Sequence, residues 1–114
     1  MPRLRSDIWI AAYIRRAMAE GAFAALRRKG VAEAGAVFIK IDRLDGTCLL
    51  FGPAPQSLAD DDGARRFTRL HQTDSIAVPD AEQRLHKELR FDSDLWIVEI
   101  EDKQGRHFLD DAVT

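Results

Sequence analysis

The residues from Gly35 to Gly52 constrain the fold most, because they have the pattern of two strands joined by a tight turn. An apolar, β-branched run from Val37 to Ile41 leads towards Asp45-Gly46, and a second apolar run extends from Thr47 to Phe51. Two such runs around an Asp-Gly pair are the strongest short-range signal for a β-hairpin. The sequence therefore predicts a central antiparallel hairpin on which the other elements pack.

The residues before this hairpin predict a helix followed by a strand. Ser6 suits the N-cap of a helix from Asp7 to Glu20, and Gly21 is a typical residue just beyond a helix end. Helical periodicity divides the apolar and aromatic residues of this segment between two faces. The face expected in the core carries Ile10, Ile14, Ala17 and Met18, and a neighbouring face carries Trp9, Tyr13, Arg16 and Glu20. A first strand is predicted from Ala22 to Lys29.

The residues after the hairpin predict a second helix between further strands. Arg66 to Leu70 alternates enough to form a fourth strand, and a helix is expected to begin near Pro79 and to end near Phe91. Leu95 to Glu101 is apolar on both faces in its first half, which is typical of a central strand. Arg106 to Leu109 is expected to return as a short edge strand.

This order of elements predicts an α+β fold in a single domain spanning residues 1–114. The elements run in the order α-β-β-β-(β)-α-β. We expect a mostly antiparallel sheet of four or five strands, with both helices packed on one of its faces.

The chain also resembles a known protein family over nearly its whole length. The residues that carry the resemblance are Trp9, Tyr13-Ile14-Arg15-Arg16, Gly21-Ala22-Phe23-Ala24, Ala34-Gly35-Ala36, Arg43-Leu44-Asp45-Gly46, Gly52-Pro53-Ala54-Pro55 and Phe91 to Asp102. The last of these segments is the most specific. The family is a small, mainly alphaproteobacterial one, catalogued as domain of unknown function 1491. The resemblance implies a single-domain bacterial protein, and it transfers no catalytic residue because the family has no assigned activity.

Composition excludes several classes of protein. With one cysteine, the chain can form no internal disulfide, and Cys48 is expected to be a small buried hydrophobe rather than a reactive thiol. The apolar run from Ile8 to Ile14 is short and is followed by Arg15-Arg16, so we predict neither a signal peptide nor a membrane span. The expected location is the cytoplasm, with no membrane partner.

Catalytic and metal-binding motifs are not recognisable in the sequence. His71, His86 and His107 do not follow a metal-ligand spacing, so we predict no metal and no cofactor. The strand carboxylates Asp42, Glu99 and Glu101 have no partner that the sequence identifies. A nucleophile turn and a glycine-rich phosphate loop are also lacking. A binding protein is therefore favoured over an enzyme, while an enzyme of unrecognised class stays open as an alternative.

Basic residues form three clusters along the chain. These are Arg15-Arg16, Arg27-Arg28-Lys29, and Arg65-Arg66 with Arg69. If the clusters met on one face, they would suit a nucleic-acid accessory protein, with Trp9 or Tyr13 stacking on bases. At a net charge of −2, an ordinary solvated surface is the favoured interpretation.

A second candidate surface consists of Trp9, Tyr13 and Arg16, which recur at helical spacing. Residues of these types are enriched where proteins bind one another. The alternative is that the helix is buried on two sides, between the sheet and a loop. The predicted function is binding of a protein or a small anionic partner through Trp9, Tyr13, Arg16 and Arg66, and the chain is also a candidate homo-oligomer.

Overall fold

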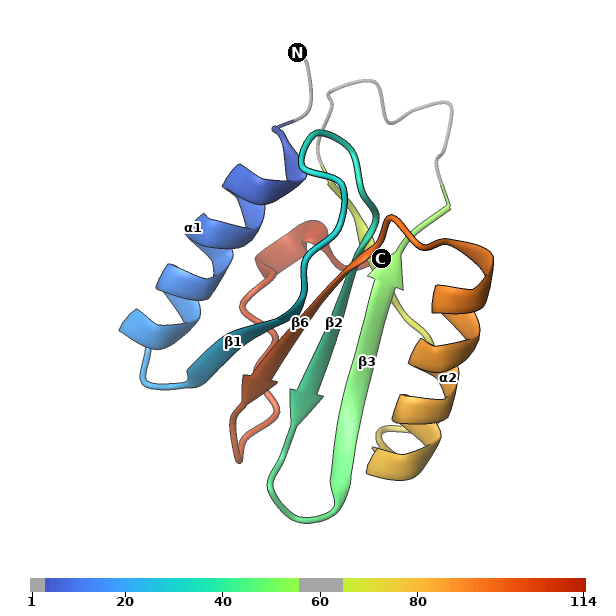
Figure 1. Cartoon of the computed structure of the whole chain (residues 1–114). Coiled ribbons are helices and arrows are strands. Elements are labelled where there is room, and N and C mark those ends of the chain that lie inside the picture. The colour runs from blue at the N-terminus through green and yellow to red at the C-terminus, as the bar shows by residue number, and fades with distance from the viewer. Residues whose placement is uncertain (1–3, 56–64) are drawn as a thin grey trace.

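The structure is a computed structural model that describes residues 4–55 and 65–114. Helices and strands alternate irregularly along the chain (Figure 1). In chain order they are α1 (Ser6–Ala19), β1 (Phe23–Arg28), β2 (Val37–Asp42), β3 (Thr47–Pro53), β4 (Phe67–Arg69), β5 (Ile76–Ala77), α2 (Val78–Phe91), β6 (Trp96–Glu101) and the short 3₁₀ helix η1 (Asp110–Ala112). The predicted α+β class is therefore confirmed.

The predicted hairpin is formed by β2 and β3, which pair antiparallel with Ile39 opposite Phe51 and Asp42 opposite Cys48. The Asp45 carboxylate accepts hydrogen bonds from both the backbone N–H and the hydroxyl of Thr47. Gly46 has a φ of 89°, which a residue with a Cβ adopts only with strain. The Asp-Gly pair therefore forms the turn that the sequence predicted.

One central strand enters the sheet out of chain order. The sheet has the order β1-β6-β2-β3-β4, and β5 pairs with β3 beside β4. Strand β6 lies between β1 and β2, antiparallel to the first and parallel to the second. The sheet is therefore mixed, although most of its pairings are antiparallel. The central position expected for the segment from Leu95 to Glu101 is confirmed.

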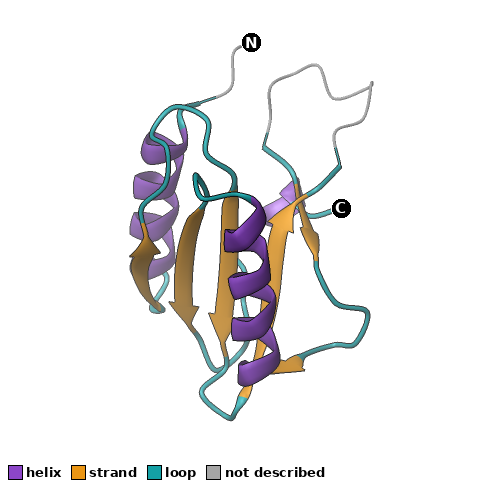
Figure 2. Cartoon of the chain, turned by 45° about the vertical axis from the view of Figure 1, so that its right-hand side comes forward, coloured by secondary structure: helices purple, strands orange, loops and turns teal. Residues whose placement is uncertain are grey.

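The two helices lie on opposite faces of the sheet, not on one face as predicted (Figures 1 and 2). Helix α1 packs on the face that carries Ile39 and Val98, whereas α2 packs on the face that carries Phe38 and Ile97. Because β2 and β6 are apolar on both sides, each face needs a cover. If both helices packed on one face, the apolar side chains of the other face would be exposed to water.

Helix α1 differs in two respects from the prediction. Ser6 is its first residue rather than its N-cap, and the Ser6 hydroxyl donates to the Gly35 carbonyl at 2.7 Å. Met18 is 52 % exposed, while Tyr13 is buried in the core instead. The reason is that the C-terminal segment packs beside α1 and covers the side that carries Tyr13.

The C-terminal residues also depart from the prediction. Arg106 to Leu109 forms no strand; the segment crosses the α1 face of the sheet, and Phe108 and Leu109 are buried in the core there. It ends with the Thr114 N–H donating to the Phe67 carbonyl at 2.8 Å. The segment therefore acts as a cover for the part of the sheet that α1 leaves open.

Candidate ligand-binding site

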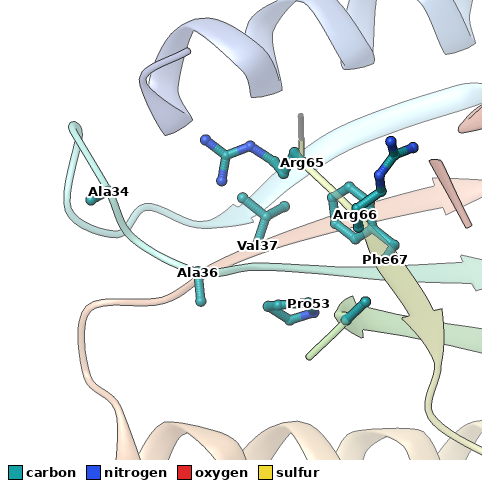
Figure 3. A pocket seen from close by; sticks show the side chains of 8 residues that line it. Ala34, Ala36, Val37, Pro53, Arg65, Arg66 and Phe67 are labelled. Atoms are coloured by element: carbon teal, nitrogen blue, oxygen red, sulfur yellow. The ribbon is translucent and has the colours of Figure 1, made fainter. Parts of the chain in front are cut away.

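A small cavity lies between the end of β3, the start of β4 and the loop before β2 (Figure 3). Its volume is about 120 Å³. The side chains that line it are those of Ala34, Ala36, Val37, Pro53, Ala54, Arg65, Arg66 and Phe67. Two consecutive arginines therefore border an otherwise apolar space.

The loop that forms one wall of this cavity is held by several distant contacts. The Trp96 indole N–H donates to the Val31 carbonyl at 2.8 Å, and the Val31 N–H donates to the Asp94 carbonyl at 2.9 Å. A Cβ at Gly35 would come within 2.7 Å of the Trp96 indole nitrogen. Glycine is thus required at this position by the close approach of the loop to β6.

The opposite wall is formed by the segment that enters β4. One Arg65 guanidinium nitrogen donates to the Leu4 carbonyl at 2.8 Å, and the group lies 5.8 Å from the Trp9 ring centre. The Ala54 N–H donates to the Arg66 carbonyl at 3.0 Å, which ties β4 to the end of β3. In Figure 3 the two guanidinium groups extend to different sides, that of Arg65 towards the start of α1.

Trp9 and Tyr13 form a ring cluster with Phe67 of β4. The ring centres of Trp9 and Tyr13 are 5.0 Å apart and nearly parallel, and Trp9 lies 5.2 Å from Phe67. The buried Tyr13 hydroxyl donates to the His107 carbonyl at 2.8 Å, and its burial raises its pKa. Tyr13 is therefore a core residue, as the alternative interpretation of this helix stated, while Trp9 links α1 to the cavity wall.

Arg16 is engaged by the protein's own C-terminal segment. Its guanidinium makes two hydrogen bonds to Asp110, at 2.6 and 2.7 Å, and a third to Glu20 at 3.0 Å. Phe108 and Asp110 both have positive φ values, 58° and 54°, so the chain turns sharply where it meets α1. Arg16 therefore binds the C-terminal segment that buries Tyr13. Arg16 itself does not line the cavity.

The structure brings together some of the predicted site residues and separates others. Trp9 and Arg66 both lie beside the cavity, joined through Phe67 and Arg65. Arg65 was not selected from the sequence, although it belongs to the same basic cluster as Arg66. In the sequence, the indication for Arg65 was its position next to Arg66. Only the folded structure shows that the Arg65 guanidinium contacts the Trp9 ring.

The three basic clusters do not form one surface. Arg27 and Arg28 are in β1 at one edge of the sheet, whereas Arg69 is in β4 at the opposite edge. Arg27 is bound by Glu82, and Arg28 donates to the Ser93 carbonyl at 2.6 Å. No continuous basic face therefore crosses the described part of the chain.

Two of the three histidines, His71 and His107, form hydrogen bonds with the backbone. The Leu50 N–H donates to His71 Nε2 at 3.1 Å, in the gap between β4 and β5, and His71 Nδ1 lies 2.8 Å from the Thr73 carbonyl. His107 Nδ1 accepts from the Leu109 N–H at 2.9 Å, and burial lowers the pKa of this imidazole. Within residues 4–55 and 65–114, no three histidine, cysteine or carboxylate side chains are arranged to hold a metal ion.

A group of charged side chains under α2 was not anticipated. Lys40 of β2, with its side chain only 5 % exposed, lies 2.7 Å from Glu82 of α2 and 3.5 Å from Glu99 of β6. Arg27 of β1 reaches the same two carboxylates at 2.8 and 3.0 Å. The hydrogen bond from Arg27, followed by that from Lys40, lowers the pKa of Glu82 to about 2. This group, named here the charged cluster, joins three strands to α2.

Cys48 lies on the same face of the sheet and is fully buried. Burial raises the pKa of its thiol to about 11, so the reactive thiolate is suppressed near neutral pH. The prediction that Cys48 is a buried hydrophobe is confirmed.

Together these observations describe a small α+β domain in which one mixed sheet lies between two helices, with a cavity at one end. The chain belongs to the family described as "Protein of unknown function (DUF1491)", whose model matches residues 4–110. The resemblance stated from the sequence is thereby confirmed. In the part of the chain that the structure describes, no helix has the length and apolar character needed to span a membrane.

Solved structures of similar proteins support this assignment. A crystal structure of a DUF1491 family protein from Caulobacter crescentus CB15 is 46% identical, covers 97% of this chain and 99% of its own, and has a TM-score of 0.81. A solution structure of a protein from A. tumefaciens is 45% identical, with 87% and 86% covered and a TM-score of 0.76. No curated protein matches this chain. The family establishes the fold and assigns no activity.

Proposed function

We propose that this protein is a non-enzymatic binding domain that takes a small anionic group in the cavity beside Arg65 and Arg66. The group is a carboxylate or phosphate, on a small ligand or on a protein partner. The observation that carries the proposal is a pair of arginines bordering an apolar cavity, with Trp9 packed behind the lining residues Phe67 and Arg65.

The chemistry of the lining supports an anion. The guanidinium fork matches carboxylate and phosphate oxygens, and its charge persists at every physiological pH. Apolar walls from Val37 and Pro53 exclude water and strengthen such a contact. A volume of about 120 Å³ suits a single anionic group better than a whole drug-sized ligand, which occupies roughly 300 Å³ or more.

The other predicted residues have supporting roles in this proposal. Trp9 lies under the Arg65 guanidinium and orients it. Tyr13 stacks on Trp9, and Arg16 holds the C-terminal segment that buries Tyr13. Tyr13 and Arg16 therefore act on the cavity through Trp9, without touching the ligand.

The test is an NMR titration of the protein with inorganic phosphate and, separately, with acetate. We expect saturable shifts of the backbone amides of Ala34, Ala36 and Val37 and of the Arg66 side-chain N–H. Arg66→Ala should weaken binding by about tenfold or more, because one charge-assisted hydrogen-bond partner is lost. Arg66→Lys, which keeps the charge and loses the fork, should fall between.

A matched control is Arg90→Ala, which removes an exposed arginine near the end of α2. This variant changes the net charge equally and should leave the titration unchanged. Equal weakening by both variants, or shifts spread evenly over the surface, would contradict a specific site.

We also propose that the protein is cytoplasmic. Its single cysteine is buried and unpaired, which suits a reducing compartment. Fractionation of cells that express the tagged protein, with a periplasmic marker for comparison, tests the location.

A further inference from the structure

We propose that an open pocket between the β3–β4 pair and the C-terminal segment binds a small organic acid that has an apolar body. The acid group would lie at Arg69 and His107, and the body would lie against Leu49 and Phe51 of β3. This site, named here the C-terminal pocket, shares no described lining residue with the cavity shown in Figure 3. A ligand here is therefore independent of an anion in that cavity.

The C-terminal pocket has the size of a small-molecule site. Its volume is about 450 Å³, within the range of roughly 300–1,000 Å³ that is typical of ligand pockets. The C-terminal segment meets the sheet at two places around it. The rings of Phe51 and His107 meet edge to face with their centres 5.4 Å apart, and the Thr114 N–H donates to the Phe67 carbonyl at 2.8 Å. Residues from both contacts line the pocket, so its walls are fixed by the fold.

Part of the lining is apolar. Leu49 and Phe51 belong to the apolar group on the α1 face of the sheet, and Val113 of the C-terminal segment packs against the same group. Leu49 and Val113 are only half-buried, so part of their apolar surface meets water. A ligand with an apolar body would cover this surface and gain hydrophobic stabilisation, whereas an inorganic ion would not. The lining therefore favours an organic ligand.

Arg69 supplies the positive charge of the pocket. It lies opposite Phe51 in the β3–β4 pairing, so the two side chains share a face. Its Nε and Nη2 donate to the carbonyls of His71 and Gln72, at 3.1 and 3.3 Å, which orients the guanidinium. Among the described residues, no carboxylate forms an ion pair with Arg69 and nothing accepts from its Nη1. The described lining also contains no acidic side chain, so the charge favours an anion.

His107 supplies a second donor. Its Nδ1 accepts from the Leu109 N–H at 2.9 Å, so the proton of the neutral ring is on Nε2. No residue in the described part of the chain accepts from that Nε2–H, which leaves it for a ligand oxygen. His71 differs, because the backbone engages both of its ring nitrogens. Asp110, three positions after His107, is bound by Arg16 at 2.6 Å, so its charge is balanced.

The test is an NMR titration of the full chain with benzoate and, separately, with hexanoate. Both probes join one carboxylate to an apolar body, flat in the first and flexible in the second. We expect saturable shifts of the backbone amides of Leu49, Phe51, Thr68 and Val113, which line the C-terminal pocket. The same spectra report on the cavity of Figure 3 through other amides, so the two sites are observed separately.

Two further probes separate the contributions of the charge and of the apolar body. Acetate keeps the carboxylate and lacks the body, whereas benzyl alcohol keeps the ring and lacks the charge. Each should bind at the C-terminal pocket with a dissociation constant about tenfold or more above that of benzoate. The reason is that each loses either the charge-assisted hydrogen bonds or the burial of apolar area.

Substitutions test the two donors. Arg69→Gln should raise the dissociation constant for benzoate by about tenfold or more, because the charge is lost. The matched control is Arg90→Gln, which makes the same change at an exposed arginine in the last turn of α2 and should leave binding unchanged. His107→Asn keeps an acceptor for the Leu109 N–H and removes the Nε2–H, so it should weaken binding by a smaller factor. Arg69 is exposed, so its variant remains a test even if His107→Asn does not fold.

Four results would overturn the proposal. The first is the lack of saturable shifts with both acids, and the second is shifts confined to Ala34, Ala36 and Val37, which would place the acids in the cavity of Figure 3. The third is an affinity for benzoate no higher than that for benzyl alcohol or for acetate, because the charge or the body would then go unrecognised. The fourth is equal weakening by Arg69→Gln and Arg90→Gln, which would assign the effect to net charge.

Discussion

On the α1 face of the sheet the buried side chains of the strands are apolar or aromatic, whereas on the α2 face four charged side chains lie beside the apolar ones. The first face joins Trp9 and Phe67 with strand residues such as Ile39. The second has a smaller apolar group, around Leu85, and the charged cluster next to it.

This difference predicts that the two helices are held by different forces. Burial of apolar area is insensitive to pH and is strengthened rather than screened by many salts. Ion pairs depend on the ionisation of their carboxylates, and a partly buried pair also requires both of its members. The α2 face should therefore respond to acid, whereas the α1 face should respond to the loss of volume.

The largest expected effect is the loss of an aromatic ring from the α1 face. Phe67→Ala should lower the free energy of unfolding by about 3–5 kcal/mol, because Phe67 is buried against Trp9 and a cavity would remain. Urea denaturation measures the change. Phe91→Ala, at a ring that is 80 % exposed, should change the stability by less than about 0.5 kcal/mol. Similar losses in both variants would contradict the packing described here.

The next effect concerns the charged cluster. Glu82→Gln should lower the free energy of unfolding by about 1–2 kcal/mol, since Lys40 is buried and loses the carboxylate that lies nearest to its amine. The same denaturation assay measures it at neutral pH. A loss below about 0.3 kcal/mol would mean that Glu99 alone satisfies Lys40.

Acid should remove this contribution selectively. The pKa of Glu82 is about 2 in the folded protein, below its ordinary value of 4.5. Its ionised form therefore stabilises the folded state above that ordinary value, and the stabilisation is lost as the pH falls through about 2. The stability difference between the wild type and Glu82→Gln should shrink steadily below about pH 4.5. A difference that stays constant down to pH 2 would assign the loss to packing instead.

The smallest effect is expected from the exposed pair between α1 and the C-terminal segment. Arg16→Ala should lower the free energy of unfolding least of these variants, because Arg16 and Asp110 are both largely in water despite their short hydrogen bonds. Raising the salt concentration should reduce even this cost. A loss comparable to that of Phe67→Ala would show that the ion pair is required to close the segment over Tyr13.

Much of the secondary structure was predictable because its causes are local. Asp45-Gly46 fixes the hairpin turn through its own backbone and side chain. Pro79, with Asp80 after it, indicated the start of α2, which begins one residue earlier at Val78. The burial of Cys48 followed from the apolar strand around it. In each case the decisive residues are close neighbours in the sequence.

Two other features had weaker local signals. The two-residue strand β5 (Ile76–Ala77) was not predicted, since so short a pairing depends on where β3 lies. The sequence left open whether Tyr13 is buried or faces a partner, because its burial depends on a segment that follows it by more than ninety residues. Helical spacing can define a face of α1, but it cannot say what covers that face.

The candidate site was predictable only in part. The sequence selected Arg66 and Trp9, and both lie beside the cavity, but it could not place Arg65 over the Trp9 ring. The charged cluster likewise unites Arg27, Lys40, Glu82 and Glu99, which lie far apart in the chain.

The sequence by itself determined where the chain turns, which segments are helices or central strands, and to which family it belongs. Only the tertiary structure decided that β6 enters between β1 and β2, that the helices take opposite faces, and which charged groups meet. The physical reason is the separation along the sequence between the residues that each interaction joins. Turn geometry, capping and hydrophobic periodicity act over a few residues, whereas strand order and the cover of each face depend on packing between segments that are distant in the sequence.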